Sequence, residues 1–494
     1  MRTLILSIDQ GTTNTKALLV GTDGRPIFRA TAALTLHRPR PGFAEQDPVA
    51  IWQSVLSVIA ECVAFAAAES ALIAGITLSN QRETALAWDR ATGHPVAPAM
   101  SWQCRRAASL CHAFSEHAQL FRERSGLPLD PLVSASKWAW LLRDDPALQR
   151  RATAGELCFG TVDSWLLYKL TQSLHACDTS NASRTGLMNL QSLQWDRDLL
   201  ALFDIPLAAL PSIQPSCSIF GLCTNVPGLD RVPIVAALGD SHAAMLGHGS
   251  AAPGTVKATY GTGSSLMLLT PHLPPPDPRL AATIAWTFAD TVQYALEGNI
   301  SMTGSAVQWV GEFLQLPNPL HDTLALAATV PSAAGVCFVP AMVGLAAPHW
   351  DTAARGTLTG LESTSTAAHM ARAALDAIAV QRRDVFEAMQ QAARLTLPAL
   401  HADGGATHNA TLMQLQANTL GRTVLRSACE DLSALGVAWL GGITLGWWSA
   451  VDQLAALPEP VTRFEPQLSA AECEQHYRVW QRAVRCTLAC KEAE

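Results

Sequence analysis

Charged residues are scarce in this 494-residue sequence: they make up 15% of it, against about 25% in an average soluble protein. The 34 basic and 41 acidic residues give a formal net charge of −7, so there is no cationic excess of the kind that attracts nucleic acid or anionic lipid. Hydrophobic residues reach 49%, which excludes disorder as the dominant state. We therefore expect a folded protein with neither nucleic acid nor a membrane as its partner.

Paired cysteine motifs are also absent. The 12 cysteines are scattered, and no two of them have the CxxC spacing of a zinc or redox site. A chain of this length does not need disulfides, so we predict reduced and mostly buried thiols. The first apolar run, Leu4 to Ile8, is too short for a signal peptide and ends at Asp9. Both observations predict a cytoplasmic protein.

Two long uncharged stretches have to be tested as membrane spans. Residues 323–350 contain three prolines, which would break a helix. Residues 432–451 are long enough to cross a bilayer, but they are rich in glycine and alanine and have an aspartate on each side. We predict a buried helix of small residues there rather than a membrane span.

Apolar runs that end in polar turns predict the architecture. Leu4 to Ile8 and Ala17 to Val20 flank the polar segment DQGTTNTK, which indicates strand, tight turn and strand. Asp47 followed by Pro48 is typical of a helix N-cap and first helical residue. A further strand is expected at Ala74 to Leu78, and strands that alternate with helices favour an α/β fold.

The same pattern restarts about 250 residues later. Strands are expected at 232–238, 256–260 and 266–269, and polar turns follow the first two. We therefore predict a duplicated domain with a boundary near residues 247–253. The two domains would cover residues 1–248 and 249–494.

Glycine–threonine turns supply the first chemical signal. Glycine lets backbone N–H groups approach a phosphate closely, and threonine adds a hydroxyl donor. Three such turns occur near an aspartate, at residues 11–13, 261–263 and 404–407, close to Asp9, Asp240 and Asp403. Because neither a Walker motif nor GxGxxG is present, P-loop and Rossmann folds lose support. Carboxylates beside phosphate donors are what a phosphoryl-transfer enzyme requires.

Several motifs now point to a family. The run DQGTT at Asp9, the run NQRET at 80–84, SWQ at 101–103, SNASRT at 180–185 and the segment 356–376 are the matching stretches. With them the sequence resembles the FGGY carbohydrate kinases, in particular the glycerol kinase branch. The resemblance implies two duplicated actin-like ATPase (ribonuclease H-like) α/β domains with a cleft between them. The first domain would bind a sugar or polyol, and the second would bind the nucleotide.

The resemblance also implies roles for individual residues, with ATP and Mg²⁺ as cofactors. Asp240 would be the catalytic base, and Asp9 and Asp240 would bind the metal. The substrate-binding positions would be Arg82, Glu83, Trp102, Asp240 and Ser241. The phosphate- and nucleotide-binding positions would be Thr12, Thr13, Asn14, Lys16, Thr262, Gly304, Gln308, Gly405 and Asn409. Two assignments stay open, because Trp102 could be a pocket wall or plain core, and His242 could contact substrate or cap a helix.

Three positions depart from glycerol kinase. Leu132 stands where the family has tyrosine, Ser241 where it has glutamine, and Ser265 where it has an aromatic residue. All three replacements shorten the side chain, so the pocket should be larger and differently polar. We expect a substrate with four or five carbons, either a polyol or a ketose, and glycerol stays open as the alternative.

The sequence thus predicts an ATP-dependent kinase that phosphorylates a hydroxyl of a small polyol or sugar. The rival hypothesis is a catalytically silent sugar-binding or regulatory protein on the same fold. Loss of Asp240 or of the threonines in the phosphate turns would favour that rival, and none of them is lost. We further expect a homo-oligomer, either a dimer or a tetramer.

Overall fold

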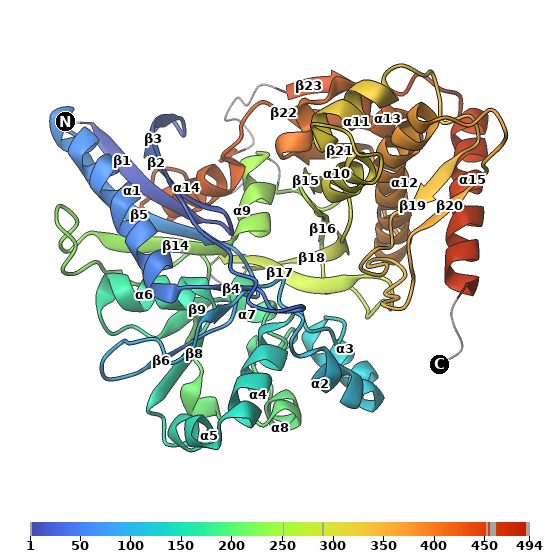
Figure 1. Ribbon diagram of the computed structural model, residues 1–494. Helices are drawn as coiled ribbons and strands as arrows, with labels where there is room; N and C mark the ends of the chain where they lie inside the picture. The colour runs from blue at the N-terminus through green and yellow to red at the C-terminus, as the bar shows by residue number, and fades with distance from the viewer. Residues whose placement is uncertain (1, 250, 289–290, 451–452, 455–460, 491–494) are drawn as a thin grey trace.

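Two mixed β-sheets form the framework of the protein (Figure 1). The computed structural model describes residues 2–249, 251–288, 291–450, 453–454 and 461–490. The first sheet contains, in spatial order, β13 (Gly221–Leu222), β14 (Pro233–Gly239), β5 (Leu72–Asn80), β1 (Thr3–Gln10), β2 (Asn14–Gly21) and β3 (Pro26–Ala33). The second contains β17 (Ala281–Phe288), β18 (Thr291–Ile300), β16 (Ser264–Thr270), β15 (Val256–Tyr260), β21 (Ala399–Asp403), β22 (Thr423–Ser427) and β23 (Val461–Phe464).

The two sheets repeat one pattern of strand directions. In the first, β1 pairs antiparallel with β2 and parallel with β5, and β5 pairs parallel with β14. In the second, β15 pairs antiparallel with β16 and parallel with β21, and β21 pairs parallel with β22. The expected duplicated α/β fold is therefore confirmed. The division at residues 248 and 249 stays a prediction, and position 250 lies outside the described residues.

The predicted helix after Asp47 is present as α1 (Pro48–Ala68). The Asp47 carboxylate accepts a hydrogen bond from the backbone N of Val49 at 2.8 Å and so caps the helix. By length and composition alone α1 could cross a membrane. Its buried side chains, which include Ile51 and Val55, pack with the strands of the first sheet in one core, as in the core helix of a folded domain.

Other helices and short strands surround the two sheets. The helices are α2 (Ala108–Ala113), α3 (Ala118–Ser125), α4 (Ser134–Asp144), α5 (Pro146–Thr153), α6 (Val162–Thr171), α7 (Thr179–Ser183), α8 (Arg197–Phe203), α10 (Gly304–Phe313), α11 (Pro319–Ala327), α13 (Ala410–Leu420) and α15 (Ala470–Ala489). The short strands are β4 (Glu45–Gln46), β6 (Leu86–Asp89), β7 (Ala99–Met100), β8 (Leu157–Gly160), β9 (Ala176–Asp178), β10 (Met188–Asn189), β11 (Gln194–Trp195), β12 (Ser212–Gln214), β19 (Cys337–Val339) and β20 (Thr357–Thr359). The uncharged stretch 323–350 therefore holds the end of α11 and β19, not a membrane-length helix.

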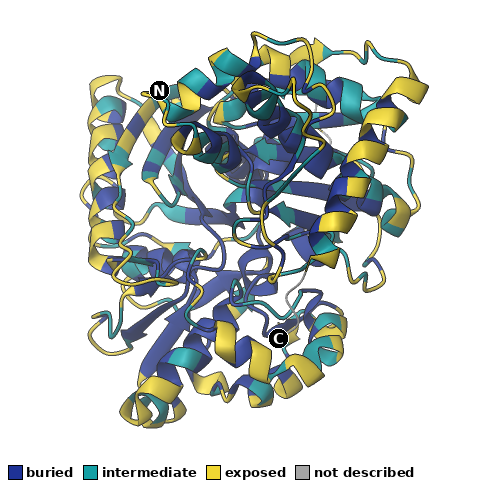
Figure 2. Ribbon diagram, turned by 45° about the vertical axis from the view of Figure 1, so that its right-hand side comes forward, coloured by how far each residue is buried: buried dark blue, intermediate teal, exposed yellow. Residues whose placement is uncertain are grey.

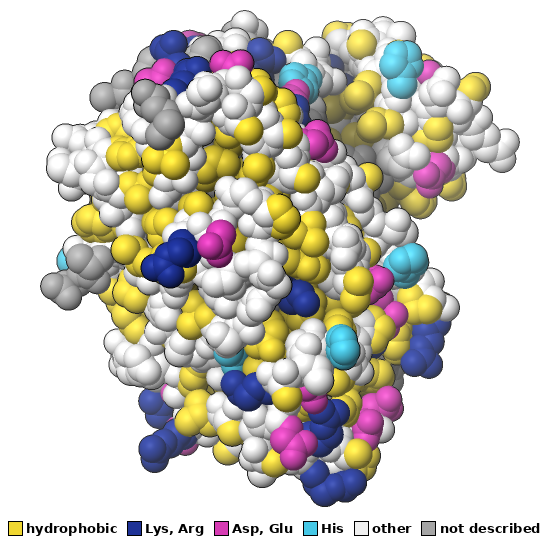
Figure 3. Space-filling model, turned by 90° about the vertical axis from the view of Figure 1, so that its left-hand side faces the viewer, with side chains coloured by type: hydrophobic (Ala, Val, Ile, Leu, Met, Phe, Trp, Pro, Cys, Tyr) yellow, Lys and Arg dark blue, Asp and Glu magenta, His cyan; other side chains and the backbone are white. Residues whose placement is uncertain are grey.

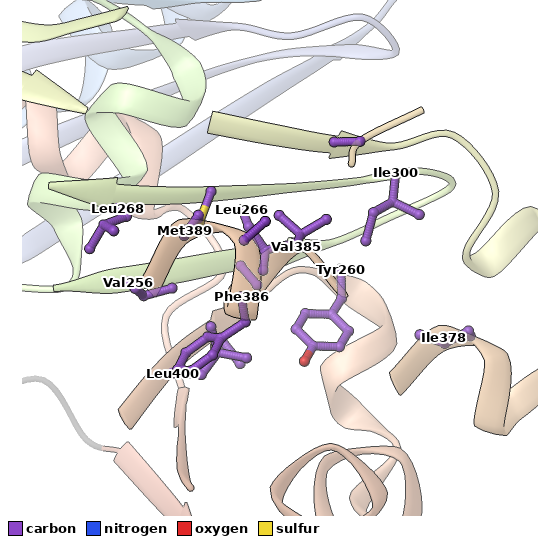
Figure 4. Packing of buried hydrophobic residues seen from close by; sticks show 14 of the residues in the cluster. Val256, Tyr260, Leu266, Leu268, Ile300, Ile378, Val385, Phe386, Met389 and Leu400 are labelled. Atoms are coloured by element: carbon purple, nitrogen blue, oxygen red, sulfur yellow. The ribbon is translucent and has the colours of Figure 1, made fainter. Parts of the chain in front are cut away.

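A long helix, α12 (Ala367–Ala393), packs on the second sheet (Figure 4). Its side chains Val385, Phe386 and Met389 are buried against Val256 and Leu266 of the strands. This core is separate from the one between α1 and the first sheet. Each sheet therefore has its own hydrophobic core.

Two helices, α9 (Asp240–Gly247) and α14 (Leu432–Thr444), share a hydrophobic cluster with strands of both sheets (Figure 1). They cross closely because Gly436 has no side chain: a Cβ there would lie 1.9 Å from the carbonyl oxygen of Ala243. Although α14 belongs to the second half of the sequence, it packs on β1, β5 and β14 of the first sheet. The Trp439 indole N–H donates to the carbonyl oxygen of Gly24, in the turn between β2 and β3 of that sheet, at 2.8 Å.

The predicted buried helix at residues 432–451 is confirmed as α14, but it is shorter than expected. It ends at Thr444 because Gly446 adopts a left-handed conformation, with φ of 74°, and the backbone N of Trp447 donates to the carbonyl oxygen of Gly442 at 2.8 Å. These contacts form the usual glycine stop of a helix. The last expected residue, Val451, lies outside the described residues.

The surface and the cysteines agree with the composition. Figure 2 shows exposed residues on the outer faces of the helices and buried residues along the strands between them. On the face in Figure 3, basic side chains are interspersed with acidic ones. All 12 cysteines are free of disulfide bonds, and seven of them are buried, in agreement with the expectation that most are buried; their reduced state stays a prediction.

Candidate active site

Three parallel strands of the first sheet end side by side at the candidate site. The register pairs Asp9 with Ser79 and Gly239 with Asn80, and the Ser79 hydroxyl donates to Oδ1 of Asp9 at 2.8 Å. Asp240 directly follows Gly239. Both carboxylates that the sequence predicts as metal ligands therefore lie at the carboxyl ends of parallel strands, where open α/β sheets bind their ligands.

Asp240 is the first residue of α9, and Gly239 is its N-cap. The Oδ1 atom of Asp240 lies 3.2 Å from Nε of Arg82 and accepts a hydrogen bond of 2.6 Å from the backbone N of Ser241. Burial raises the pKa of Asp240, whereas the positive charges of Arg82 and Lys257 lower it. Because 38% of the side chain stays exposed, water screens these effects. Asp240 is thus an oriented carboxylate that solvent and ligands can reach.

The environment of Asp9 suits a divalent cation. Burial and the negative charge of Asp240 together raise the pKa of Asp9 to about 6, against a hydrogen bond from Ser79 that lowers it. Two carboxylates that repel each other gain from a cation between them, and Mg²⁺ binds through one or two carboxylates together with substrate phosphates. Within the described ranges, no group of three or more His, Cys, Asp or Glu side chains could hold a metal. Asp9 and Asp240 therefore fit a magnesium ion whose remaining ligands are phosphate and water.

A chain of buried ion pairs lies behind Asp240. Arg82 Nη2 is 2.8 Å from Oε1 of Glu297, and Arg184 Nη1 is 2.9 Å from Oε2 of the same carboxylate. Arg184 Nε is in turn 2.6 Å from Oε1 of Glu83. The Glu297 side chain is fully buried, and both arginines are at least nine-tenths buried. Glu297 lies on β18 of the second sheet, so this cluster joins the two halves of the molecule.

The charges in this cluster stabilise one another. Burial alone would raise the pKa of Glu297, but Arg184 and Arg82 outweigh it and hold the pKa well below its usual range. Arg82 Nη1 is buried without a hydrogen-bond partner among the described residues. One donor of the predicted substrate-binding arginine is therefore not satisfied by the described residues.

Glu83, which the sequence predicts as a substrate ligand, is largely committed to the protein. Its side chain is 5% exposed and is paired with Arg184, and its backbone has a positive φ of 57°. Nζ of the buried Lys137 donates to the carbonyl oxygen of Glu83 at 3.1 Å and also to that of Leu132. Lys137 thereby brings Leu132, one of the three departures from glycerol kinase, next to Glu83.

The other two departures, Ser241 and Ser265, lie together, with hydroxyl oxygens 3.4 Å apart. Nζ of Lys257 donates to the Ser241 hydroxyl at 2.6 Å, and the Ser265 hydroxyl donates to Oε1 of Glu297 at 2.8 Å. Burial lowers the pKa of Lys257, against the negative charges of Asp403, Asp240 and Glu297. The structure thus places the predicted substrate residue Ser241 between a buried ammonium group and a second serine.

Trp102 and His242 had two open assignments each. Trp102 is 37% exposed and its indole N–H donates to the Thr12 hydroxyl at 2.9 Å, so it is not a core residue. His242 is fully buried, and its Nε2 lies 3.4 Å from the Thr283 hydroxyl. It does not cap α9, because Gly239 holds that position.

The first phosphate turn is only partly as expected. Thr12 and Thr13 lie in the turn between β1 and β2, with Thr13 exposed, and Asn14 is the first residue of β2. Lys16, however, points away to the second half of the chain: its Nζ lies 2.8 Å from Oδ1 of Asp431. A lysine so paired is not a free phosphate ligand in this conformation.

The nucleotide-side turns are more open. Thr262 is exposed, and its carbonyl oxygen accepts from the backbone N of Thr303 at 3.1 Å. Gly304, the first residue of α10, lies so close that a Cβ would be 2.8 Å from the carbonyl oxygen of Gly261. Glycine is therefore required at position 304 by the packing of this turn, whatever ligand binds there.

The remaining nucleotide-side residues make few contacts. Gln308 donates only within α10, to Oε1 of Glu312 at 2.8 Å. A Cβ on Gly405 would meet no atom within 4 Å. Asn409 caps α13, because its Oδ1 accepts from the backbone N of Leu412 at 3.0 Å. The structure gives Asn409 a local role that the sequence did not anticipate, and the nucleotide roles of all three residues stay predictions.

Sequence reasoning missed Glu297 and Lys257 altogether. Both lie within strands, among apolar residues, at 0% exposure. A charged residue inside an otherwise apolar strand is the one signal that could have found them, since a buried charge needs a partner.

Comparison with known proteins defines the class. The sequence matches the N-terminal domain of the FGGY family of carbohydrate kinases over residues 4–247 and the C-terminal domain of that family over residues 256–445. It is 47% identical to an apulose kinase of Pectobacterium atrosepticum, over 97% of each chain. It is 45% identical to a glycerol kinase of Citrifermentans bemidjiense, over 98% of each chain. Among solved structures, Plasmodium falciparum glycerol kinase with ADP has a TM-score of 0.92 at 29% identity, and the match covers 99% of this chain and 98% of that one.

These matches and the duplicated sheets define a two-domain α/β kinase with the actin-like ATPase fold. The chain belongs to the FGGY family of carbohydrate kinases. The resemblance in the sequence is thereby confirmed, as is the expectation of an ATP-dependent kinase that acts on a sugar or polyol. No observation favours the catalytically silent alternative.

Proposed function

We propose that this kinase transfers the γ-phosphate of ATP to a hydroxyl of a polyol or ketose with four or five carbons, and that it uses Mg²⁺. The observation that carries the proposal is Asp240, which Arg82 holds at the edge of the sheet beside Asp9. The short Ser241 and Ser265 side chains favour the larger substrates over glycerol. Relatives named apulose kinase and glycerol kinase support a small sugar or polyol as the class of substrate.

The proposed roles follow from the geometry. Asp240 accepts the proton of the attacking hydroxyl, and Arg82 keeps its carboxylate oriented at 3.2 Å. The unpartnered Nη1 of Arg82 donates to a substrate oxygen. Asp9 and Asp240 would hold a magnesium ion, which would neutralise phosphate charge. The turns at Thr12 and Thr262 supply hydroxyl and N–H donors to the phosphates.

The site requires the two halves of the molecule to work together. The N-terminal domain contributes Arg82 and Trp102, and the C-terminal domain contributes the turns at Thr262 and Gly405. Closure of the halves on both ligands would exclude water and suppress hydrolysis of ATP. We retain a cytoplasmic homo-oligomer, either dimer or tetramer, as part of the proposal.

A substrate panel tests this function. The protein is incubated with ATP and Mg²⁺ and with glycerol, erythritol, D-threitol, L-erythrulose, D-xylulose or D-ribulose, and the product is identified by mass spectrometry. We expect a phosphorylated product from at least one four- or five-carbon compound, at a higher kcat/KM than for glycerol. The absence of any phosphorylated product from a folded protein would overturn the proposal.

A further inference from the structure

The Ser241 and Ser265 hydroxyls form a pair whose direction is set by buried charges. The Ser241 oxygen accepts from Nζ of Lys257 at 2.6 Å, because an ammonium group can only donate. The Ser265 hydroxyl donates to Oε1 of Glu297 at 2.8 Å, because a carboxylate can only accept. Lys257 and Glu297 are both fully buried, so water does not compete for these bonds.

These two hydrogen bonds leave one donor on Ser241 and one acceptor on Ser265. Ser241 has used a lone pair, so its own O–H proton is free to donate elsewhere. Ser265 has used its proton, so its remaining lone pair is free to accept. The oxygens are 3.4 Å apart, which is long for a hydroxyl–hydroxyl hydrogen bond. One oxygen atom can lie within hydrogen-bond distance of both.

We propose that Ser241 and Ser265 together bind a single substrate hydroxyl, which accepts from Ser241 and donates to Ser265. This inference rests on the proposed kinase function and sharpens its substrate class. A carbonyl oxygen could use only the Ser241 half of the pair, because it has no proton to donate to Ser265. The pair therefore selects a hydroxyl in addition to those that Arg82 and Asp240 contact.

The position of the pair says where that hydroxyl lies on the substrate. Ser241 adjoins Asp240 in the first turn of α9, and Ser265 is on β16 of the second sheet. Ser241 is buried and Ser265 is half-buried, whereas the side chain of Asp240, the neighbour of Ser241 in sequence, is 38% exposed. A three-carbon polyol would leave the Ser241 donor and the Ser265 acceptor without a hydrogen-bond partner. Unpaired polar groups in the site disfavour the smaller compound as a substrate. The preferred substrate is a polyol or ketose of at least four carbons.

Lys257 and Glu297 are positioning residues in this arrangement, since they act through the two serines. Lys257→Gln should lower the preference for the larger substrate through its KM, with the KM for ATP unchanged. The test does not depend on this variant, because removal of a buried ammonium group can also reduce folding.

Two small substitutions test the pair. Ser241→Ala and Ser265→Ala each delete one hydroxyl, and kcat/KM is measured for glycerol and for the best larger compound of the panel. We expect each variant to lower the ratio of the larger compound to glycerol by about tenfold, the typical effect of one lost hydrogen bond. The control is Ser365→Ala, since the Ser365 hydroxyl accepts only from the backbone N of Glu362, before α12. That variant should leave the ratio unchanged.

The outcomes separate the two proposals. If the parent protein phosphorylates nothing, the kinase function fails. If it phosphorylates the panel but both serine variants keep the parent ratio, only the hydroxyl subsite is overturned. A parent enzyme that prefers glycerol would overturn the subsite and the proposed preference for four or five carbons, while transfer of phosphate to a polyol stands.

Discussion

The two sides of the proposed site differ in how much structure they have before any ligand binds. On the substrate side, Arg82, Glu83 and Glu297 are buried and joined by ion pairs of 2.6 to 2.9 Å, with Arg184 between Glu83 and Glu297. On the nucleotide side, Thr262 is exposed and Gly405 faces open space. A site with fixed donors discriminates strongly between hydroxyl patterns, whereas an open turn adapts to a ligand that carries most of its own charge. Substitutions on the two sides should therefore differ in kind.

The largest effect is expected at the residue between the two sides. Asp240→Asn should lower kcat by about 10²- to 10⁴-fold, because an amide cannot accept the proton of the attacking hydroxyl. Steady-state kinetics with the best panel substrate measures the loss, and nucleotide binding by calorimetry should stay close to that of the parent. A variant with more than about a tenth of the parental kcat would remove Asp240 from the role of base.

On the substrate side, Glu297→Gln should lower the stability of the fold as well as the rate of the reaction. The variant leaves Arg82 and Arg184 buried with one negative charge fewer, and breaking a buried pair costs about 3 kcal/mol. Urea unfolding gives the change in free energy. The matched control is Glu312→Gln, because Glu312 accepts from Gln308 at an exposed hydrogen bond. If the two variants were equally stable, the buried ion pairs on the substrate side would not contribute to the fold before ligand binds.

Lys137 gives the substrate side a pH signature. Burial lowers its pKa from 10.5 to about 8, against the charge of Glu83. A depressed lysine pKa means that its stabilising contribution is present above pH 10.5 and is lost as the pH falls through about 8. As the pH is lowered from 10.5 to 8, the free energy of unfolding of the parent should therefore fall relative to that of Lys137→Met by up to about 3 kcal/mol. Denaturant unfolding at pH 8 and pH 10.5 would show this difference, and a constant gap would refute it.

The smallest effect is expected on the nucleotide side, at Asn409. Asn409→Ala removes the cap of α13 and should cost about 1 kcal/mol of stability. Asn409→Asp keeps a good cap but places a negative charge beside the proposed nucleotide site, so it should raise the KM for ATP with little loss of stability. If the Asn409→Asp variant had an unchanged KM for ATP, Asn409 would only cap α13 and would have no role in nucleotide binding.

Sequence reasoning succeeded where the signal is local. The strands around Asp9 and Asp240 were predictable because apolar runs end in glycine–threonine or glycine–aspartate turns, and Asp47 with Pro48 marks a helix start. These patterns depend on neighbours within a few residues. The duplicated α/β architecture follows from their recurrence.

The rest depends on contacts between distant residues. Nothing near Lys16 in the sequence shows that Asp431 would take its ammonium group, and nothing near Glu297 shows that two arginines from the first half would surround it. The packing of α14 on the first sheet is equally non-local. Such pairings are decided by tertiary packing, which a single sequence does not display.

The placement of α14 has a consequence for biosynthesis. The Ser7 hydroxyl in the first strand donates to the carbonyl oxygen of Ala434, 427 residues further along the chain. At synthesis rates of roughly 5–20 residues per second, the ribosome makes Ala434 roughly 20–85 s after Ser7. The apolar surface of the first sheet that α14 covers thus emerges long before its cover. During that interval the nascent chain should be a substrate for chaperones that bind exposed hydrophobic strands.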